Sequence, residues 1–388
     1  MTKRICMVAY THYRSDARPR REATALTQRG DIVDFFSLGN ASKLSQEIID
    51  DVNIFNLPAK RYRGSSAIAY IRSYIRFFRQ ALTLITKHHF TKRYDVVHVH
   101  TMPDFMVFVA ALIKPLGVKV ILDVHDTMPE LYQSKFGLRG QHPLIAALVM
   151  QERIACAFSD RVICVHEPHR DLLMRRGVDG NKITPILNVP DSKIFGPPRD
   201  NPVLSFEPPR IFYHGTIAQR LGLDVALHAF RRVHDCIPTV SFNILGTGDQ
   251  AEALHSLIAD LGLNDAVNFA DKQFAVEELP KLLADATIGL VPNRSDPATQ
   301  MMLPVKLLEY VHLGIPAIAP RLPVIKHYFS EDALAFYEPG NCESMATAII
   351  NTIKDQESTN MRRLQASTFA RQYQWDNLKH DLYSVIDS

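Results

Sequence analysis

Short apolar runs of strand length alternate with amphipathic segments of helical length along nearly the whole chain. Strands that are apolar on both faces and alternate with helices are typical of a parallel sheet covered by helices on both sides. In the first half, strands are predicted at Arg4–Tyr10, Asp31–Leu38, Asp95–His100, Val118–Val124, Arg161–Val165 and Ile183–Asn188. Helices are predicted between them at Arg18–Arg29, Asp104–Leu116, Pro143–Ala157 and Pro168–Arg176. The pattern therefore predicts an α/β fold with a doubly wound parallel sheet.

The alternation stops at residues 189–209 and then begins again. This segment, VPDSKIFGPPRDNPVLSFEPP, is rich in proline and polar residues and has no periodicity, so we expect a linker. Strands are predicted after it at Arg210–His214, Val240–Leu245, Ala266–Phe269, Ile288–Pro292 and Pro316–Ala319. Helices are predicted at Leu223–Asp235, Ala251–Leu261, Val276–Ala284, Pro304–His312 and Glu343–Ile353, and the chain ends in helical sequence at Ser358–Tyr373 and Trp375–Ile386.

The length of the chain supports two domains. At about 100–200 residues per domain, 388 residues are too many for one compact unit. We expect one domain at residues 1–195, a second at 205–365, and a helical segment at 366–388 that packs back on the first domain. Ligands of doubly wound sheets bind at the carboxyl ends of the strands, so the active site is expected in a cleft between the two sheets.

Composition excludes several other classes of protein. The five cysteines are scattered and form no C-x-x-C spacing, which argues against a disulfide framework or a zinc site and favours a reducing compartment. The apolar run at the N-terminus is short and leads into polar residues, as in a first strand and not in a signal peptide. No apolar stretch reaches the roughly 20 residues that a membrane-spanning helix needs. We therefore expect a cytoplasmic protein.

Positive charge is concentrated in the first half of the chain. Residues 1–200 contain 29 Lys and Arg against 19 Asp and Glu, a net charge of +10, whereas residues 201–388 contain 15 against 22, a net charge of −7. Residues 52–94 include no acidic residue, and their nine basic residues are Lys60, Arg61, Arg63, Arg72, Arg76, Arg79, Lys87, Lys92 and Arg93. Such asymmetry indicates that this half of the chain meets an anionic surface.

Three of these residues, Arg72, Arg76 and Arg79, fall on one face of a helical segment that is otherwise aromatic and aliphatic. This pattern is typical of an amphipathic helix on an anionic membrane. A helix with its apolar side in the domain core and its arginines in water has the same pattern, and both can hold at once. No nucleic-acid-binding module accompanies the run. We expect contact with the inner face of a membrane and none with nucleic acid.

The segment YHGTIAQRLG, residues 213–222, follows a predicted strand and precedes a helix. Gly215 allows a ligand to approach the backbone closely, and the helix that begins near Gly222 offers free N–H groups. Arg220 adds donors that suit phosphate oxygens. The segment is therefore a candidate phosphate-binding loop, although an ordinary strand-to-helix loop would look similar.

A second candidate is the segment LPVKLLEYVHLGIP, residues 303–316. Pro304 suits the first turn of a helix and Gly314 suits its end. Lys306 and Glu309 are three residues apart and share a face. The carboxylate can accept hydrogen bonds from the two hydroxyls of a ribose, and the ammonium can reach a diphosphate. A surface ion pair would have the same spacing, but the surrounding leucines favour a buried helix.

These segments resemble glycosyltransferase family 4, whose members are retaining enzymes with the GT-B fold of two Rossmann-like domains facing each other across a cleft. The resemblance runs in order through nearly the whole chain, in DVVHVHTMPDF, VILDVHDTMPELY, NVPDSKIF, HGTIAQRLGLDVALHAF, FNILGTGDQAEAL, ADATIGLVP and PVKLLEYVHLGIPAIAP. It implies transfer of a sugar from UDP or GDP to a glycan or lipid-linked acceptor. It also implies that the enzyme needs no metal ion and no cofactor, the nucleotide sugar being a substrate.

The resemblance assigns roles by position. In the second half, Glu309 matches the ribose ligand, Arg220 and Lys306 the cations at the diphosphate, and the remaining donor-binding positions are Gly215, Thr216, Gly246 and Gly248. In the first half, His125 and Asp126 match the catalytic polar cluster that faces the transferred sugar, and the positions on the acceptor side are Asp16, Arg18 and His100.

The chain departs from the family pattern at three places. Many members have two glutamates seven residues apart on the nucleotide helix, but the position before Glu309 is Met301. The phosphate lysine of the loop is replaced by Leu221, with the cation one residue earlier at Arg220. A double glycine found near the N-terminus of many relatives is replaced by THYRSDARPR. A nucleotide-sugar epimerase or an inactive nucleotide-binding scaffold therefore stays open as an alternative, whereas a dinucleotide oxidoreductase lacks its G-x-G-x-x-G after the first strand.

Overall fold

The computed structural model describes residues 2–39, 43–59, 62, 67–199 and 206–388. It forms two compact units, and each is described by itself. Unit 1 comprises Met1–Asn188 and Asn377–Ser388, and unit 2 comprises Val189–Asp376. The predicted linker, residues 189–209, lies in unit 2, and its residues 200–205 are outside the described part of the chain.

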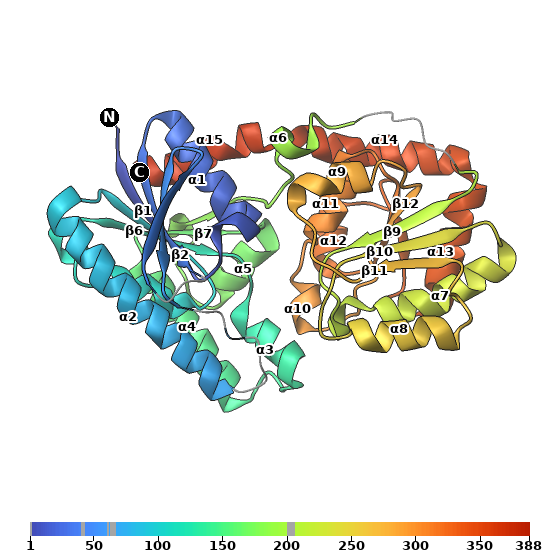
Figure 1. Cartoon of the computed structure of the whole chain (residues 1–388), viewed down its shortest axis with the longest axis horizontal. Helices are drawn as coiled ribbons and strands as arrows, with labels where there is room; N and C mark the ends of the chain where they lie inside the picture. Colours follow the sequence, from blue (N-terminus) through green and yellow to red (C-terminus); the bar gives the residue numbers. More distant parts are fainter. Residues whose placement is uncertain (1, 40–42, 60–61, 63–66, 200–205) are drawn as a thin grey trace. The chain divides into compact units, whose positions relative to one another are not determined.

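Unit 1 is built on an eight-stranded sheet of order β3-β4-β2-β1-β5-β6-β7-β8 (Figure 1). Its strands are β1 Arg4–Ala9, β2 Ile32–Leu38, β3 Ser45–Ile49, β4 Val52–Leu57, β5 Val96–His100, β6 Lys119–Val124, β7 Arg161–Cys164 and β8 Ile183–Pro185. Neighbouring strands pair in parallel except β3, which is antiparallel to β4 at the edge. The predicted parallel sheet is confirmed, and the β3–β4 hairpin extends it.

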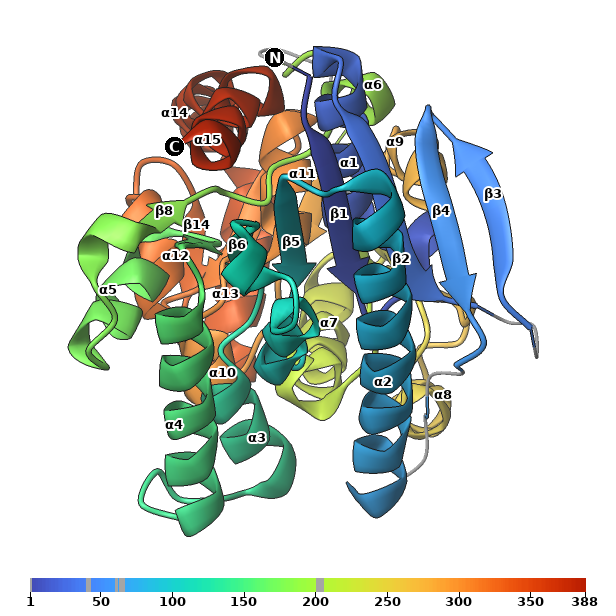
Figure 2. The same cartoon turned by 90° about the vertical axis from the view of Figure 1, so that its left-hand side faces the viewer.

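Helices cover both faces of this sheet. They are α1 Ala17–Arg29, α2 Ala67–Lys92, α3 Met128–Phe136, α4 Pro143–Phe158 and α5 Glu167–Arg175, with 3-10 helices η1 Tyr13–Ser15, η2 Asp104–Ala110, η3 Lys114–Leu116 and η4 Gly180–Lys182. One face packs against α2, η2 and α4 in a single apolar core (Figure 2). The side chains of His98, His100 and Asp123 alternate with the residues of that core along β5 and β6, so they lie on the other face, under α1.

The last helix, α15 Trp375–Asp387, carries the chain from unit 2 into unit 1. Lys119 Nζ donates to Ser388 O at 2.8 Å, Tyr383 Oη donates to Ala25 O at 2.9 Å, and Arg29 pairs with Asp387 at 3.0 Å. The predicted return of the C-terminal helix to the first domain is confirmed.

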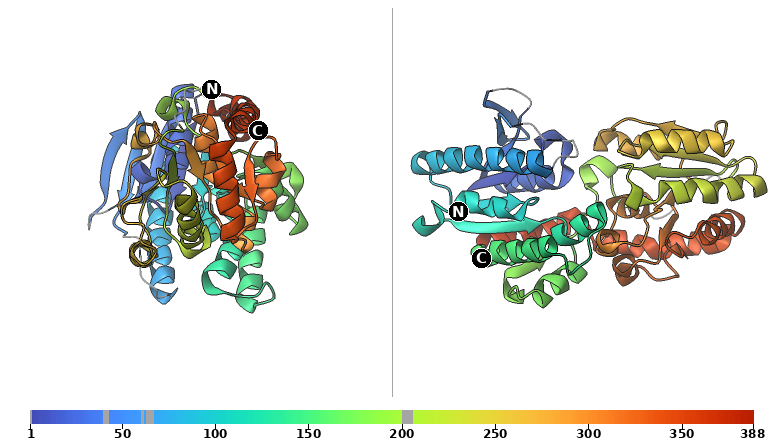
Figure 3. Two further views of the ribbon diagram at one scale, coloured as in Figure 1. Left: turned by 90° about the vertical axis from the view of Figure 1, so that its right-hand side faces the viewer. Right: turned by 90° about the horizontal axis from the view of Figure 1, so that it is seen from below.

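Unit 2 has a six-stranded parallel sheet of order β11-β10-β9-β12-β13-β14. Its strands are β9 Arg210–His214, β10 Ser241–Leu245, β11 Val267–Ala270, β12 Ile288–Leu290, β13 Ala317–Pro320 and β14 Ala335–Tyr337. Its helices are α6 Ser192–Phe195, η5 Gln219–Leu221, α7 Leu223–Cys236, α8 Ala251–Asp260, η6 Val276–Glu278, α9 Leu279–Leu282, α10 Pro297–Gln300, α11 Val305–His312, α12 Pro323–Tyr328, α13 Cys342–Lys354 and α14 Gln356–Gln372. Figure 3 shows helices on both sides of the sheet in each unit.

The predicted elements differ from the observed ones where long-range packing decides. The single helix predicted at Asp104–Leu116 is wrong: the segment forms two 3-10 helices, η2 and η3. Pro115 cannot donate to a helical hydrogen bond, and Gly117 ends the segment in a left-handed conformation with φ 90°. The strands β3, β4 and β14 were not predicted; β3 is largely exposed and β14 has only three residues, whereas β4 has six and was missed.

Candidate active site

Two glycine-containing loops lie against each other at the carboxyl ends of β9 and β10. Gly215 N–H donates to Leu245 O at 2.9 Å. A Cβ on Gly246 would lie 1.8 Å from Gly215 O, and a Cβ on Gly248 would lie 2.0 Å from Ile217 O. Only glycine fits at these two positions, and its lack of a side chain lets the two loop backbones lie this close together. It also leaves the loop backbones accessible to a ligand.

The helix α11 places Lys306 beside the first of these loops. Lys306 Nζ lies 3.6 Å from the centroid of the Tyr213 ring, and a Cβ on Gly215 would lie 3.3 Å from it. The nitrogen is buried and has no hydrogen-bond partner among the described residues. Burial lowers the pKa of Lys306 to about 7. Attraction to Glu309 opposes this shift, and repulsion from Arg220 adds to it. A buried amine without an acceptor, next to an open backbone loop, suits an anionic ligand.

Glu309 lies one turn further along α11. Its Oε2 is 3.2 Å from Nε2 of His214, and its side chain is only 7% exposed. Burial lowers the pKa of His214 to about 3, and repulsion from Lys306 contributes, so this imidazole is neutral. Burial raises the pKa of Glu309 to about 7. The carboxyl therefore faces a neutral imidazole and no strong ion pair, and it can accept hydrogen bonds from vicinal hydroxyls.

The other predicted donor-binding residues lie at the same end of the sheet. Arg220, in η5, has a buried Nε without a hydrogen-bond partner in the described part of the chain. Gly215 and Thr216 are exposed, and Tyr213 Oη donates to Thr216 O at 2.5 Å. Gly222 begins α7 in a left-handed conformation with φ 65°. The structure therefore brings together in unit 2 the residues that the sequence assigned to the donor.

Met301, the residue in place of the family's first glutamate, ends α10 and is half-buried. Its backbone N–H donates to Ala298 O at 3.1 Å. A thioether offers at most a weak acceptor, so this position supplies no charged contact to a sugar.

In unit 1 the predicted residues surround one carboxylate that the sequence analysis did not single out, Asp123. Its Oδ1 accepts a hydrogen bond from Arg18 Nη2 at 2.9 Å, and its Oδ2 accepts one from Arg18 Nε at 3.0 Å. The same Oδ2 lies 3.1 Å from His125 Nε2 and 3.2 Å from His100 Nδ1. Arg18 was predicted on the acceptor side, and the structure places its guanidinium in this buried ion pair. The one signal for Asp123 in the sequence is that it is a charged residue within a predicted strand that is otherwise mostly apolar, two positions before His125.

Glu22 and His98 extend this cluster. Arg18 Nε lies 3.3 Å from Glu22 Oε1, and His98 Nε2 lies 3.8 Å from Glu22 Oε2. Potential metal-ligating atoms of Glu22, His98, His100 and Asp123 all lie within 4.8 Å of one another. The guanidinium of Arg18 already contacts both carboxylates and supplies their positive charge, so we assign no metal to this cluster.

Two predicted residues of unit 1 remain. Asp126, predicted with His125 at the transferred sugar, is exposed, and Asp16, predicted on the acceptor side, is half-buried at the start of α1. Attraction to Asp16 contributes to the raised pKa of His125. His125 is 15% exposed, whereas Asp123 is fully buried. The imidazole is therefore the member of the cluster that a substrate can reach from solvent.

The predicted membrane residues Arg72, Arg76 and Arg79 are exposed on α2. Of the nine basic residues in the acid-free run, Lys60, Arg61 and Arg63 lie outside the described residues, and Lys92 pairs with buried Asp34 at 2.8 Å. Ile71 and Ile75, which directly precede Arg72 and Arg76, are 56% and 46% exposed. Within the described residues, no helix has the length and apolar character needed to cross a bilayer.

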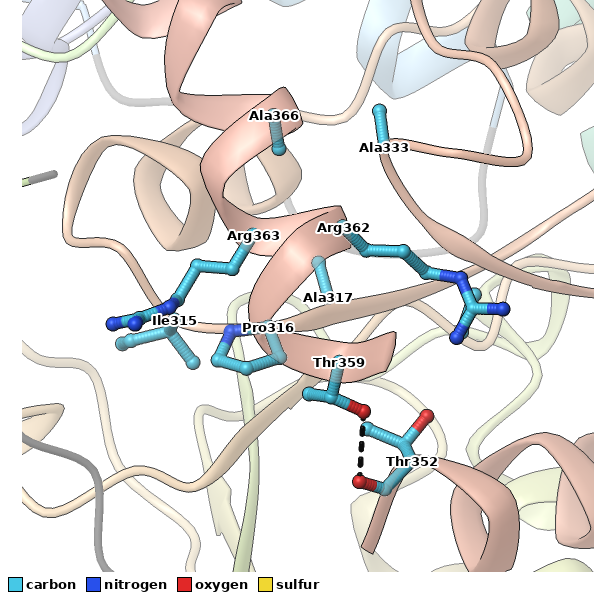
Figure 4. Close-up of a pocket in the computed structure, with 10 residues that line it drawn as sticks. Ile315, Pro316, Ala317, Ala333, Thr352, Thr359, Arg362, Arg363 and Ala366 are labelled. Atoms are coloured by element: carbon cyan, nitrogen blue, oxygen red, sulfur yellow. Dashed lines mark hydrogen bonds between the residues drawn. The ribbon is translucent and has the colours of Figure 1, made fainter. Parts of the chain in front are cut away.

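A small pocket in unit 2 lies apart from these residues (Figure 4). It is lined at the start of β13 by Pro316 and Ala317, and from α13 and α14 by Thr352, Thr359 and Arg362. Figure 4 shows the hydrogen bond from Thr359 Oγ1 to Thr352 O, which is 2.9 Å long. Because it lies at the amino end of the strand, this pocket is not part of the predicted donor site.

Comparisons with known proteins identify the chain. Residues 20–192 match the model of Glycosyltransferase Family 4, and residues 208–355 match the model of Glycosyl transferases group 1. The chain belongs to glycosyltransferase family 4. It is accordingly a retaining glycosyltransferase that uses a nucleotide-sugar donor, as the sequence predicted.

The glycosyltransferase is similar to solved structures of the GT-B fold over its full length. It aligns with sucrose-phosphate synthase from Thermosynechococcus elongatus with a TM-score of 0.78 and 16% identity, covering 99% of this chain and 98% of that one. It aligns with the Anabaena protein HepE in complex with UDP-glucose with a TM-score of 0.70 and 14% identity, covering 99% of both chains. These alignments confirm the predicted fold.

Among curated relatives, the glycosyltransferase is 22% identical over 344 residues to chitobiosyldiphosphodolichol beta-mannosyltransferase from Kluyveromyces lactis. That match covers 81% of this chain and 75% of the relative. Another curated relative that it matches is covered over only 36% of its length. These comparisons show the family of the chain and do not identify its acceptor or the linkage that it forms.

Proposed function

We propose that this glycosyltransferase transfers a hexose or related sugar from a UDP- or GDP-sugar to a lipid-linked or polysaccharide acceptor in the synthesis of a cell-surface glycan. The observation that carries the donor part is the buried, unpartnered amine of Lys306 beside Gly215, with the carboxyl of Glu309 one turn away. The ammonium and carboxylate of these residues match the two ends of a ribose diphosphate, which offers an anion and a pair of hydroxyls.

The proposed chemistry needs stabilisation of a departing diphosphate and of an oxocarbenium-like sugar. Lys306, Arg220 and the N–H groups of the Gly215 loop stabilise the diphosphate as its charge grows. A phosphate oxygen of the leaving group takes the proton of the acceptor hydroxyl, so no strong side-chain base is required. On the acceptor side, His125 and Asp126 orient hydroxyl groups by hydrogen bonding.

The test of the donor site is Glu309→Gln. Glutamine keeps the shape of the side chain but removes the charge, and a hydrogen bond to a charged group contributes about 1.5–3 kcal/mol. Calorimetric titration with UDP- and GDP-sugars should show affinity weakened by roughly 10- to 150-fold. Glu252→Gln, at an exposed position of α8, is the control and should bind like the wild type. Equal affinities for Glu309→Gln and the wild type would remove Glu309 from the site. Consumption of donor without any acceptor would instead favour an epimerase.

The acceptor part rests on the surface of unit 1. Helices α2 and α4 lie on the same face of the sheet (Figure 2), and η2 contacts both of them. Besides the α2 residues already named, this surface exposes large apolar side chains at Leu112, Leu116, Leu144, Met150 and Ile154. Exposed apolar side chains beside exposed arginines fit an anionic bilayer, where a lipid-linked acceptor resides. The Kluyveromyces lactis relative, by its name, acts on a dolichol-linked sugar.

Co-sedimentation with vesicles tests this location. The wild type should pellet with vesicles that contain anionic lipid at low salt, partly detach as salt rises, and ignore neutral vesicles. Changing Arg72, Arg76 and Arg79 to Glu should abolish pelleting. The matched control changes three exposed lysines of unit 2 to Glu, namely Lys272, Lys281 and Lys354. This control variant should still pellet with the vesicles. If the wild type ignores anionic vesicles at low salt, the acceptor is a soluble glycan.

A further inference from the structure

The buried carboxylate of Asp123 is fixed from two sides. Arg18 donates two hydrogen bonds to it, one to each oxygen, at 2.9 and 3.0 Å. The guanidinium is itself held in place, because Nη1 donates to Ile186 O at 2.9 Å and Nε lies 3.3 Å from Glu22 Oε1. Arg18 and Asp123 are both buried, so the carboxylate cannot turn without breaking an ion pair in a low-dielectric environment.

Both histidines lie against Oδ2 of the fixed carboxylate, the oxygen that also accepts from Arg18 Nε. His125 Nε2 lies 3.1 Å from it and His100 Nδ1 lies 3.2 Å from it. A carboxylate oxygen only accepts, so Nε2 of His125 donates to it when protonated, whereas Nε2 without a proton would face the lone pairs of the carboxylate. The backbone N–H of His125 donates to Thr101 Oγ1 at 3.1 Å, which holds the start of the loop.

The charges of the cluster agree with this geometry. Glu22 and Asp123 are two carboxyls, and Arg18 is one cation. Burial lowers the pKa of His98 well below its ordinary value. For His125, burial works against the charged form, but attraction to Asp123 and the hydrogen bond with it are stronger, and the pKa is raised. Repulsion from Arg18 opposes this shift and attraction to Asp16 supports it.

We infer that Asp123 is a positioning residue of this glycosyltransferase that acts through His125: it accepts the Nε2 proton and so leaves Nδ1 for an oxygen of the sugar or the acceptor. Asp123 itself is buried and does not touch substrate. A carboxylate that fixes the tautomer and the orientation of an imidazole is a known way to prepare a histidine for hydrogen bonding or proton transfer. The inference rests on the proposed function only for the part played by substrate.

The tautomer can be measured without substrate. In protein labelled with ¹⁵N-histidine, long-range ¹H–¹⁵N correlation spectra distinguish Nε2–H from Nδ1–H, and His125→Gln assigns the signals. We expect His125 to carry its proton on Nε2 in the neutral form and to become charged at a higher pH than free histidine. An Nδ1–H tautomer in the wild type overturns the inference, and this measurement needs no variant of Asp123.

Kinetics then test whether Asp123 acts through His125. Asp123→Asn should lower kcat about tenfold or more with little change in the KM for donor. In a His125→Ala background the same substitution should cost no more than about twofold, because residues that act as a unit are not additive. Equal losses in both backgrounds would mean that Asp123 only supports the fold.

A matched control is Asp34→Asn. Asp34 is another fully buried strand carboxylate of unit 1, and it pairs with Lys92 and accepts a hydrogen bond from Tyr94 Oη at 2.7 Å. Any loss of kcat that Asp34→Asn causes through lower stability should be the same in the wild type and in the His125→Ala variant. If the wild type has no transferase activity at all, the proposed function fails, while the spectra still decide the role of Asp123.

Discussion

From neighbouring turns of α11, Lys306 and Glu309 lie against consecutive side chains at the end of β9, with Lys306 Nζ 3.6 Å from the centroid of the Tyr213 ring and Glu309 Oε2 3.2 Å from His214 Nε2. Burial moves the pKa of both groups to about 7, downward for the amine and upward for the carboxyl. The free enzyme therefore holds this pair only partly charged near neutral pH. A ribose diphosphate would favour the charged form of each group, because the phosphates attract an ammonium and the hydroxyls donate to a carboxylate.

Donor binding should consequently move protons in a direction that changes with pH. At pH 8 the free amine is mostly neutral, so binding should take up a proton on Lys306. At pH 6 the free carboxyl is mostly protonated, so binding should release a proton from Glu309. Calorimetry in buffers of different ionisation enthalpy measures both. Lys306→Met should lose the uptake at pH 8 and keep the release at pH 6. Proton exchange of one sign at both pH values would contradict the assignment.

Arg220→Ala and Lys306→Ala should each lower turnover more than donor binding. The charge on the diphosphate grows in the transition state, so a cation there contributes more to kcat than to affinity. Loss of one preorganised donor of this kind typically costs about 10²–10³ in kcat. Steady-state kinetics with a confirmed donor and acceptor provide the measurement. Arg232→Ala, at an exposed position of α7, should behave as the wild type. Wild-type kcat in both variants would rule out the phosphate clamp.

Gly246→Ala should disrupt the donor loops. The added Cβ would lie 1.8 Å from Gly215 O, so one of the two loops has to move. We expect donor binding to be lost and the melting temperature to fall. Gly262→Ala is the matched control, since Gly262 also has a positive φ, of 65°, but a Cβ there meets nothing within 4 Å. It should lower stability by about 1 kcal/mol and keep donor affinity. Equal donor affinity in the two variants would show that the close approach of the loops is not needed.

Asp104→Asn should remove one carboxyl's contribution to the dependence of the unfolding free energy on pH. Both oxygens of Asp104 are buried without a hydrogen-bond partner in the described residues, and Glu152 is buried beside Arg176, whose Nη1 donates to it at 2.9 Å. Burial raises the pKa of Asp104 and of Glu152 to about 7. A carboxyl whose pKa is raised by folding contributes stability that is present below about pH 4 and is lost as pH rises through about 7.

Between pH 5 and 7 the contribution of Asp104 to stability should therefore fall as pH rises. Asp104→Asn should remove this contribution, which changes the slope of stability against pH by up to one proton, or about 1.4 kcal/mol per pH unit. Urea unfolding at several pH values gives the slope. Asp171→Asn, at an exposed position of α5, is the control and should leave it unchanged. An unchanged slope in Asp104→Asn would mean that this carboxyl is already ionised at pH 5.

The residues proposed for the donor site in unit 2 could be placed on their elements from the sequence because they lie in two continuous segments. Gly215 and Arg220 follow one strand, and Lys306 and Glu309 lie on one helix, so strand-to-helix order and helical spacing place them. Their packing was not readable. The neutral His214 beside Glu309 and the Tyr213 ring under Lys306 depend on how α11 crosses the sheet.

The sequence by itself determined the α/β class, most helices and strands, and the family, because each of these depends on local periodicity or on motifs within about twenty residues. Only the tertiary structure showed that Arg18 is buried in an ion pair with Asp123. These contacts join α1, β6 and the segment after β8, and Arg18 and Asp123 are 105 residues apart in the chain. No local pattern specifies such a contact, since it exists only when parallel strands place their carboxyl ends at one edge of the sheet.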